Sequence, residues 1–203
     1  WIGSVDQRDS VLYMKADTPW KSIEDFFTAT EAPRCGATGS ADQTTIVVNA
    51  MQEALGTKVK IVRGYPGGPE IDLAIEKGEV HCRATAISAH FAREPYLTWH
   101  RQGFDRHIIQ TWAKRDSRMA DTPTIYELMD KKKTPDIGRG IARVLLASGT
   151  VGRPMLATPG VPADRVRILR AAYLKALKEP ELVAEAKKKR MDLDFLSGEE
   201  LEG

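Results

Sequence analysis

The hydrophobic pattern of residues 58–83 changes its period twice. Residues 58–63 alternate charged and apolar side chains, as a β-strand does. Residues 64–69 hold three glycines and two prolines, which favour a turn. Apolar residues then recur on one helical face through residues 70–77 until Gly78, a typical helix end, and a further apolar stretch follows. The pattern therefore predicts a strand, a glycine-rich loop, a helix and a second strand.

A similar unit lies directly before this one. Residues 34–40 read as a short strand that runs into a loop of small residues. Residues 41–55 then carry apolar side chains at helical spacing up to Gly56. Two consecutive units of this kind predict an α/β fold with a parallel sheet and helices on its faces.

The remaining pattern predicts elements on both sides of these units. Strands are expected at 11–14, 107–112 and 192–196, and helices at 163–177 and from Ile125 and Pro180 onward. Residues 141–146 are apolar and fit either a helix or a strand. The chain is long enough for one domain or two small ones.

Composition narrows the class of protein. The 203 residues include 30 basic and 28 acidic side chains mixed along the chain, for a net charge of +2. A nucleic-acid binder would normally show a basic stripe, so no nucleic-acid partner is expected. No apolar run approaches the length that spans a bilayer, so we expect no direct membrane insertion. The chain opens on Trp1 without a methionine, which we interpret as a removed natural N-terminus. A missing signal peptide therefore carries no weight against export.

The two cysteines leave two interpretations open. Cys35 and Cys82 form a disulfide if their strands are neighbours in the sheet. Otherwise they are buried thiols that behave as small apolar side chains.

The two glycine-containing loops are the candidate binding elements. Each brings backbone N–H groups to a helix start, an arrangement that favours an anion. If their strands are parallel neighbours, both loops lie at the same edge of the sheet, where ligands collect in open α/β folds. The glycines of each loop also have a purely structural explanation, because many turns from a strand into a helix need glycine in order to bend. Neither has the lysine of a nucleotide P-loop or the spacing of a dinucleotide fingerprint, so no cofactor is expected.

Catalytic and metal-binding chemistry finds little support in the sequence. The four histidines show no metal-ligand spacing and are expected to be structural or exposed; they are His81, His90, His100 and His107. His81 and Cys82 are adjacent on a predicted strand, so they point to opposite faces and are not a catalytic pair. No carboxylate pair stands out among the acidic residues. We therefore predict no catalytic residue and no metal site.

A set of motifs in a fixed order resembles one family. In chain order, the motifs lie at residues 1–4 with 11–12, 21–22 with 25–26, 36–40, 64–67 with 70, 78–80, 122–124, 159–166, 169–170, 179–181 and 197–201. Together they resemble the extracytoplasmic solute receptors of tripartite tricarboxylate transporters, the Bug family. Where many members have an Asp-Gly pair after the Gly-Glu-Val motif, this chain has His81-Cys82.

The resemblance implies a fold, a location and partners. It implies a type II periplasmic-binding-protein fold, with two α/β lobes that close on a small organic carboxylate. The complete second lobe would be residues 10–118, and residues 1–9 with 119–203 would form a first lobe that is truncated at its N-terminus. Such a receptor is periplasmic, delivers its ligand to membrane permease subunits and does no chemistry. The alternatives are an enzyme or a ligand-sensing regulatory domain on a similar scaffold.

The resemblance also implies ligand-binding residues, which we place by motif position. The first loop would contribute Thr38, Gly39 and Ser40. The second loop would contribute Tyr65, Gly67 and Gly68. After the strand that ends near Arg83, the resemblance adds Thr85 and Ser88.

Overall fold

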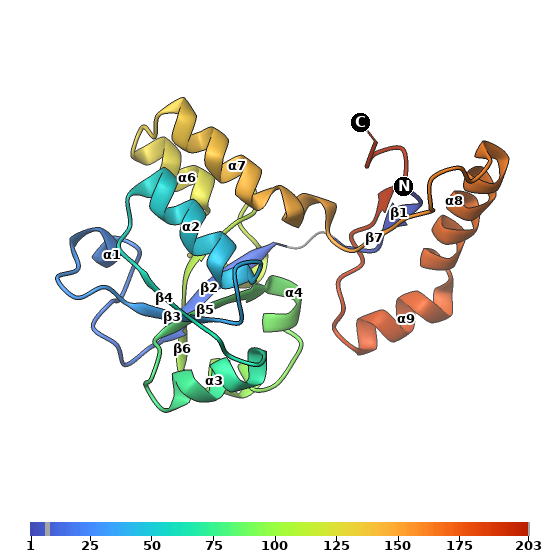
Figure 1. Cartoon of the computed structure of the whole chain (residues 1–203). Helices are drawn as coiled ribbons and strands as arrows, with labels where there is room; N and C mark the ends of the chain where they lie inside the picture. Colours follow the sequence, from blue (N-terminus) through green and yellow to red (C-terminus); the bar gives the residue numbers. More distant parts are fainter. Residues whose placement is uncertain (7–8, 203) are drawn as a thin grey trace. The chain divides into compact units, whose positions relative to one another are not determined.

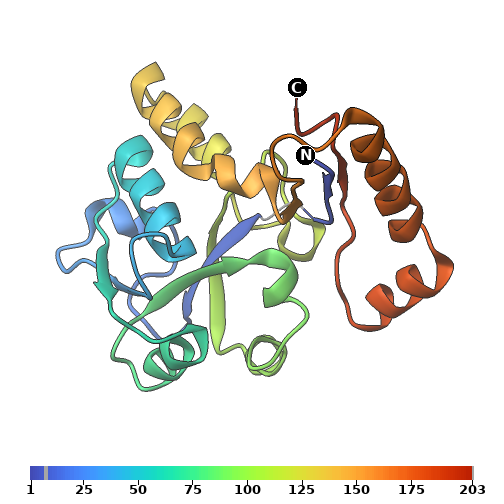
Figure 2. The ribbon, with the colours of Figure 1, turned by 45° about the vertical axis from the view of Figure 1, so that its right-hand side comes forward.

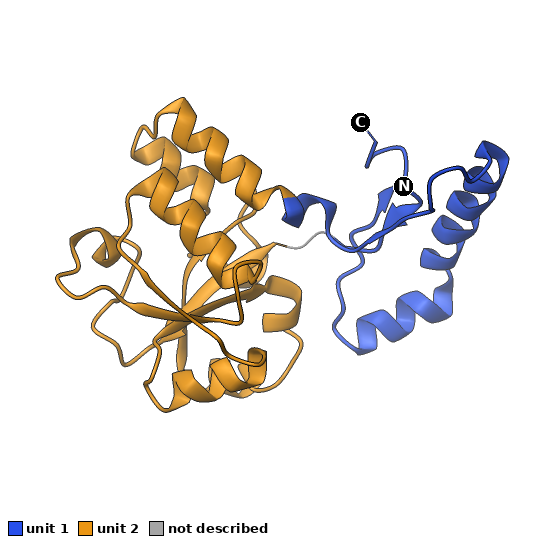
Figure 3. Cartoon of the chain, in the orientation of Figure 1, with its two compact units in different colours: residues 1–8, 148–203 blue, residues 9–147 orange. Residues whose placement is uncertain are grey.

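The computed structural model describes residues 1–6 and 9–202, which form two compact units. The larger unit is Asp9–Ala147, and the smaller one contains the described residues of 1–8 and 148–203 (Figure 3). Every helix among the described residues is too short or too polar to span a bilayer. Each unit is considered below by itself.

A five-stranded sheet organises the larger unit. Its strand order is β4-β3-β5-β2-β6. The strands are β2 (Ser10–Lys15), β3 (Arg34–Ala37), β4 (Lys60–Arg63), β5 (Cys82–Ala86) and β6 (Asp105–Gln110). β3 pairs in parallel with both β4 and β5, whereas β2 runs antiparallel to its neighbours β5 and β6 (Figure 1). Four strands of the sheet are therefore parallel and one is reversed, which refines the parallel sheet predicted from the sequence.

Helices cover both faces of this sheet. They are α1 (Asp25–Thr28), α2 (Gln43–Leu55), α3 (Gly68–Glu76), α4 (Ile87–His90), α5 (Tyr96–Gln102), η1 (Ser117–Met119), α6 (Ile125–Lys131) and α7 (Asp136–Val151). Figures 1 and 2 show α2 and α3 on opposite sides of the sheet. Two separate hydrophobic clusters follow from this layering.

Side-chain alternation on β2 sets the composition of the two clusters. Leu12 and Met14 are fully buried against residues of α2 and α6. Tyr13, between them in the sequence, points to the other face and packs with residues of α3 and α5. This period of two is the geometry of a strand that is buried on both faces.

The smaller unit contains an antiparallel sheet of three two-residue strands in the order β7-β1-β8. Its elements are β1 (Gly3–Ser4), β7 (Pro154–Met155), α8 (Ala163–Leu177), α9 (Pro180–Lys188) and β8 (Leu196–Ser197). Arg153 joins two of its segments through an ion pair of 2.7 Å from Nη1 to Oδ2 of Asp6.

Most of the elements predicted from the pattern are confirmed. The helix at 163–177 has the predicted bounds, and residues 141–146 are helical within α7. The strand predicted at 107–112 begins and ends two residues earlier, and the strand predicted at 192–196 is wrong except for Leu196. Residues 119–147 pack with the larger unit, so the unit boundary at 147/148 differs from the lobe boundary at 118/119 that the resemblance implied. The assignment of lobes stays a prediction.

Cys35 and Cys82 form a disulfide between the adjacent strands β3 and β5. The two residues face each other in the register of the parallel pair, with Cα atoms 4.4 Å apart. The interpretation as two buried thiols is therefore wrong. The bond closes a loop with a sequence separation of 47 that contains α2, β4 and α3.

Replacing both cysteines by alanine is expected to lower the free energy of unfolding by about 2–4 kcal/mol, because the unfolded chain regains the entropy of that loop. Urea unfolding of the wild type and of the Cys35→Ala/Cys82→Ala variant, each with and without a reductant, measures the effect. The reductant should destabilise the wild type and leave the variant unchanged. Two titratable thiols in the unfolded, unreduced wild type would contradict the disulfide.

Candidate functional site

The carboxyl ends of four strands meet at one edge of the larger sheet. Ala37 at the end of β3 pairs with Arg63 at the end of β4. β5 runs parallel to β3, and its last residue, Ala86, pairs with Ser10, the first residue of β2. The loops that follow β3 and β4 therefore lie at the same edge, as the sequence predicted.

The two loops are in direct contact. The backbone N–H of Tyr65 donates to the carbonyl of Ala37 over 3.4 Å. Gly36 allows this close approach, because a Cβ at its position would lie 2.5 Å from Cγ2 of Ile71 in α3 and 3.4 Å from Cε2 of Tyr65. A side chain at position 36 would push α3 and the Tyr65 ring away from β3.

In the first loop, Asp42 takes up the donors that an anion would use. Its Oδ1 accepts from the Thr44 N–H at 2.7 Å and caps α2. Its Oδ2 accepts from the Thr38 hydroxyl at 2.9 Å and from the Thr38 N–H at 3.2 Å. The Gly39 carbonyl accepts from the Thr45 hydroxyl, and Ser40 is exposed. The start of α2 therefore carries its own carboxylate.

The second loop is different, because no side chain caps α3. Gly67 is the extended N-cap residue, and Gly68 and Pro69 form the start of the helix. The N–H groups of Gly68 and Glu70 lie in the first turn, where a helix supplies no acceptor. The positive end of the helix dipole adds to their attraction for an anion. Of the two loops, the one at α3 leaves its first N–H groups without a capping side chain, and the Glu70 carboxylate lies in the same turn.

The remaining predicted residues lie at the same edge but differ in access. Thr85 is 8% exposed and pairs with Val11 within the sheet. Ser88 lies in the single turn of α4 and is half-buried. Their assignment as ligand-binding residues stays a prediction.

Three polar residues at this edge were missed in the sequence. The side-chain amide of Gln43 donates to the Ser10 hydroxyl at 2.9 Å, and the Ser10 N–H donates to the Thr111 hydroxyl at 2.9 Å. Their positions in the sequence did not predict this, because Ser10 reaches the carboxyl edge only through the reversed direction of β2.

Comparison with known proteins identifies the fold. No protein-family model and no curated protein sequence matches the chain. A TctC solute-binding protein from Polaromonas superposes with a TM-score of 0.70 at 19% identity, over 98% of this chain and 62% of that one. An R. palustris protein solved with adipate superposes with a TM-score of 0.60 at 15% identity, over 95% of this chain and 58% of that one. MatC from Rhodopseudomonas palustris with bound malate superposes with a TM-score of 0.51 at 14% identity, over 87% of this chain and 69% of that one.

The chain has the fold of TctC-type solute-binding proteins. This confirms the predicted fold class, that of periplasmic binding proteins. The chain spans less than two thirds of the length of the Polaromonas protein and of the adipate-bound one. At these identities the likeness concerns the fold, and each bound acid is a property of the protein that was solved with it.

Behind the α3 loop of this TctC-type fold lies a buried polar network. Nη1 of Arg83 donates to the Gly68 carbonyl at 3.1 Å and to the Asp72 carboxylate at 2.9 Å. The hydroxyl groups of Tyr13 and Tyr96 donate to the same carboxylate at 2.6 and 2.9 Å. Burial raises the pKa of Tyr96 to about 12, so its hydroxyl stays a donor at neutral pH. The network fixes the carbonyl of Gly68 and with it the first turn of α3.

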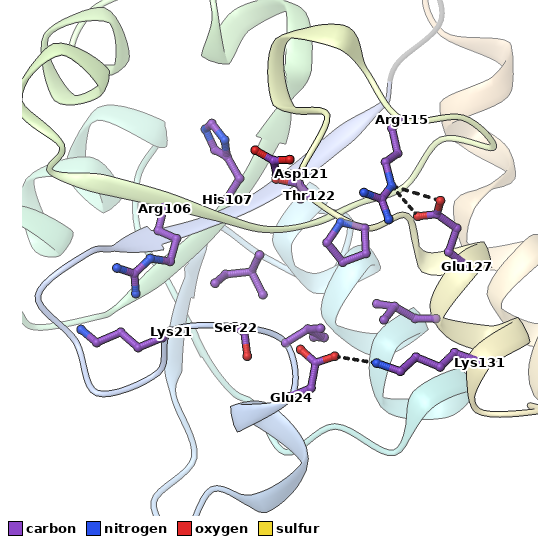
Figure 4. Close-up of a pocket in the computed structure, with 14 residues that line it drawn as sticks. Lys21, Ser22, Glu24, Arg106, His107, Arg115, Asp121, Thr122, Glu127 and Lys131 are labelled. Atoms are coloured by element: carbon purple, nitrogen blue, oxygen red, sulfur yellow. Dashed lines mark hydrogen bonds and ion pairs between the residues drawn. The ribbon is translucent and has the colours of Figure 1, made fainter.

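A hollow of about 500 Å³ lies elsewhere on the larger unit (Figure 4). None of the predicted site residues line it. Its charged side chains include two ion pairs, Arg115 with Glu127 at 2.9 Å and Lys131 with Glu24 at 3.1 Å. Lys21 and Arg106 also line the hollow. The carboxyl edge is the candidate for an anionic ligand because ligands collect at this edge in open α/β folds.

Replacing Asp72 by asparagine is expected to lower the free energy of unfolding by about 3–5 kcal/mol, because it leaves the buried Arg83 guanidinium without its counter-charge. Chemical denaturation followed by circular dichroism measures the loss. Asp17→Asn is the matched control, because Asp17 pairs with Lys15 at an exposed position and should change stability by less than about 0.5 kcal/mol. Equal stability of the two variants would contradict the role of the network.

Proposed function

We propose that the chain is a solute-binding receptor for a small organic carboxylate and that it carries out no chemical reaction. The observation that carries the proposal is the TctC-type fold, which extends over 98% of the chain in the Polaromonas comparison. Two further proteins with this fold were solved with the dicarboxylates adipate and malate. The uncapped start of α3 at the carboxyl edge supplies the N–H groups that a carboxylate requires.

In the proposed site, the carboxylate accepts from the backbone N–H groups of Gly68 and Glu70. Tyr65 and Gly67 border the same loop, and Thr38, Gly39 and Ser40 approach it from the neighbouring loop, since Tyr65 contacts Ala37. Backbone donors held by a rigid network bind a charge without first having to reorient. Delivery to membrane permease subunits and an extracytoplasmic location belong to the same proposal.

Carboxylate binding is expected to raise the thermal unfolding midpoint of the chain, because a ligand that binds the native state stabilises it. Adipate, malate and citrate are compared with adipamide, which keeps the adipate chain but lacks both charges. At least one acid should bind in isothermal titration calorimetry, and the diamide should not. An equal response to adipate and adipamide, or no response to any of the acids, would count against a carboxylate receptor.

Asp42→Asn is expected to tighten carboxylate binding about two- to fivefold, which corresponds to the about 0.3–1 kcal/mol of one charge at a helix terminus. The amide removes a negative charge from the carboxyl edge but still accepts from Thr44, since asparagine caps helices as well as aspartate. Asp25→Asn is the control, because Asp25 also accepts backbone N–H groups but follows the opposite end of β2. Weaker binding by the Asp42 variant would refute the assigned edge.

A further inference from the structure

Four potential metal ligands converge on one face of the larger sheet. They are His90, His100, Asp105 and His107, and each offers one ligand atom that lies within 4.8 Å of the other three. The sequence prediction treated the histidines separately and found no metal-ligand spacing. The fold brings three of the four histidines together. His81 lies elsewhere, where its Nδ1 accepts from the backbone N–H of Arg34.

The distances from His90 and Asp105 to the other members of this cluster lie within about 0.3 Å of those in a tetrahedral metal site. Nε2 of His90 lies 3.0 Å from Nε2 of His100, 3.0 Å from Nε2 of His107 and 3.0 Å from Oδ2 of Asp105. The same Asp105 oxygen is 3.2 Å from His100 and 3.7 Å from His107. A tetrahedral Zn²⁺ with ligands at about 2.0–2.2 Å holds its ligand atoms about 3.3–3.6 Å apart.

The rings of His100 and His107 each lie within hydrogen-bond distance of the His90 ring, but the carboxylate of the cluster has no donor among the described residues. His90 is fully buried, and the side chain of Asp105 is 1% exposed. In the part of the chain that the structure describes, neither carboxylate oxygen of Asp105 has a hydrogen-bond partner. Nδ1 of His90 has none there either. Nε2 of His90, 3.0 Å from Oδ2 of Asp105, supplies a positive charge only when its imidazole is protonated. A buried carboxylate without donors requires a positive charge nearby.

Three elements supply the ligands in defined orientations. Asp105 and His107 are two residues apart on β6, so their side chains point to the same face of the sheet. Arg106, between them, points to the other side of the strand, as Figure 4 shows for Arg106 and His107. His100 comes from α5 and His90 from the end of α4. The ring of Tyr13 stacks on His90 with centroids 4.6 Å apart and restricts its orientation.

The side chains of the cluster also form a donor set that a metal ion prefers. Neutral imidazoles offer a nitrogen lone pair, and three of them with one carboxylate form a donor set suited to zinc.

We propose that His90, His100, Asp105 and His107 bind one Zn²⁺ ion. Because the protein supplies four ligands, the ion has no open position for a substrate, and its role is structural. It joins α4, α5 and the start of β6, which otherwise meet through ring contacts such as that of Phe91 with His100. The site involves none of the residues assigned to carboxylate binding, so either proposal can fail without the other.

The test is metal titration of the tag-free chain after treatment with a chelator. Co²⁺ alone should bind with a stoichiometry of one and give the strong visible absorption of tetrahedral Co²⁺. Zn²⁺ should then displace it and raise the thermal unfolding midpoint. His100→Gln should lower the Zn²⁺ affinity by at least about 10–100-fold. This is the loss that follows when a residue that only supports a metal ligand is removed.

His81→Gln is the matched control, because it removes the one histidine outside the cluster and should leave Zn²⁺ affinity unchanged. His107→Gln serves as a second ligand variant, since both His100 and His107 are about one fifth exposed and tolerate a polar replacement. Octahedral Co²⁺ spectra or no stoichiometric binding by the wild type would overturn the site whatever the variants do. Equal affinities of the His81 and His100 variants would also overturn it.

Discussion

The parallel pairing of β3 with both β4 and β5 is the constraint on which the rest of the larger unit depends. It brings the loop after β3 and the loop after β4 to one edge, where the Tyr65 N–H reaches the Ala37 carbonyl. It also sets Cys35 opposite Cys82, so that a covalent bond fixes the register. A shift of β3 by one residue would turn each of its side chains to the opposite face of the sheet and separate Cys35 from Cys82.

The single reversed strand, β2, gives the two faces of the sheet different roles. Leu12 and Met14 point to the face that α2 covers with apolar side chains. Tyr13 points to the other face, where it donates to Asp72 and stacks on His90. The polar network that fixes the start of α3 and the proposed metal ligands therefore share this face and one tyrosine. Polar groups on this buried face hold a loop and two short helices that apolar contacts alone would leave less defined.

Local patterns in the sequence were sufficient for the strand–loop–helix units and for the α/β class, because the period of apolar residues reports directly on burial. The periplasmic-binding-protein fold was implied by the family resemblance. Properties that depend on which strands are neighbours were not accessible. The disulfide stayed one of two interpretations, and Ser10 was missed because nothing local marks the direction of β2. Asp42 was not recognised as a competitor for the anion. The His90–His107 cluster combines ligands from three elements, and Asp105 was missed because the strand was expected to begin at His107.

Carboxylate binding at the α3 loop is tested most directly by following the backbone amide resonances of the ¹⁵N-labelled chain during a titration with adipate. The largest shifts should fall on Gly67, Gly68 and Glu70, whose N–H groups lie at the uncapped helix start. Smaller shifts should reach Thr38 and Tyr65 in the contacting loops. Shifts confined to the hollow around Lys21 and Arg106, with the α3 loop unchanged, would contradict the assigned site.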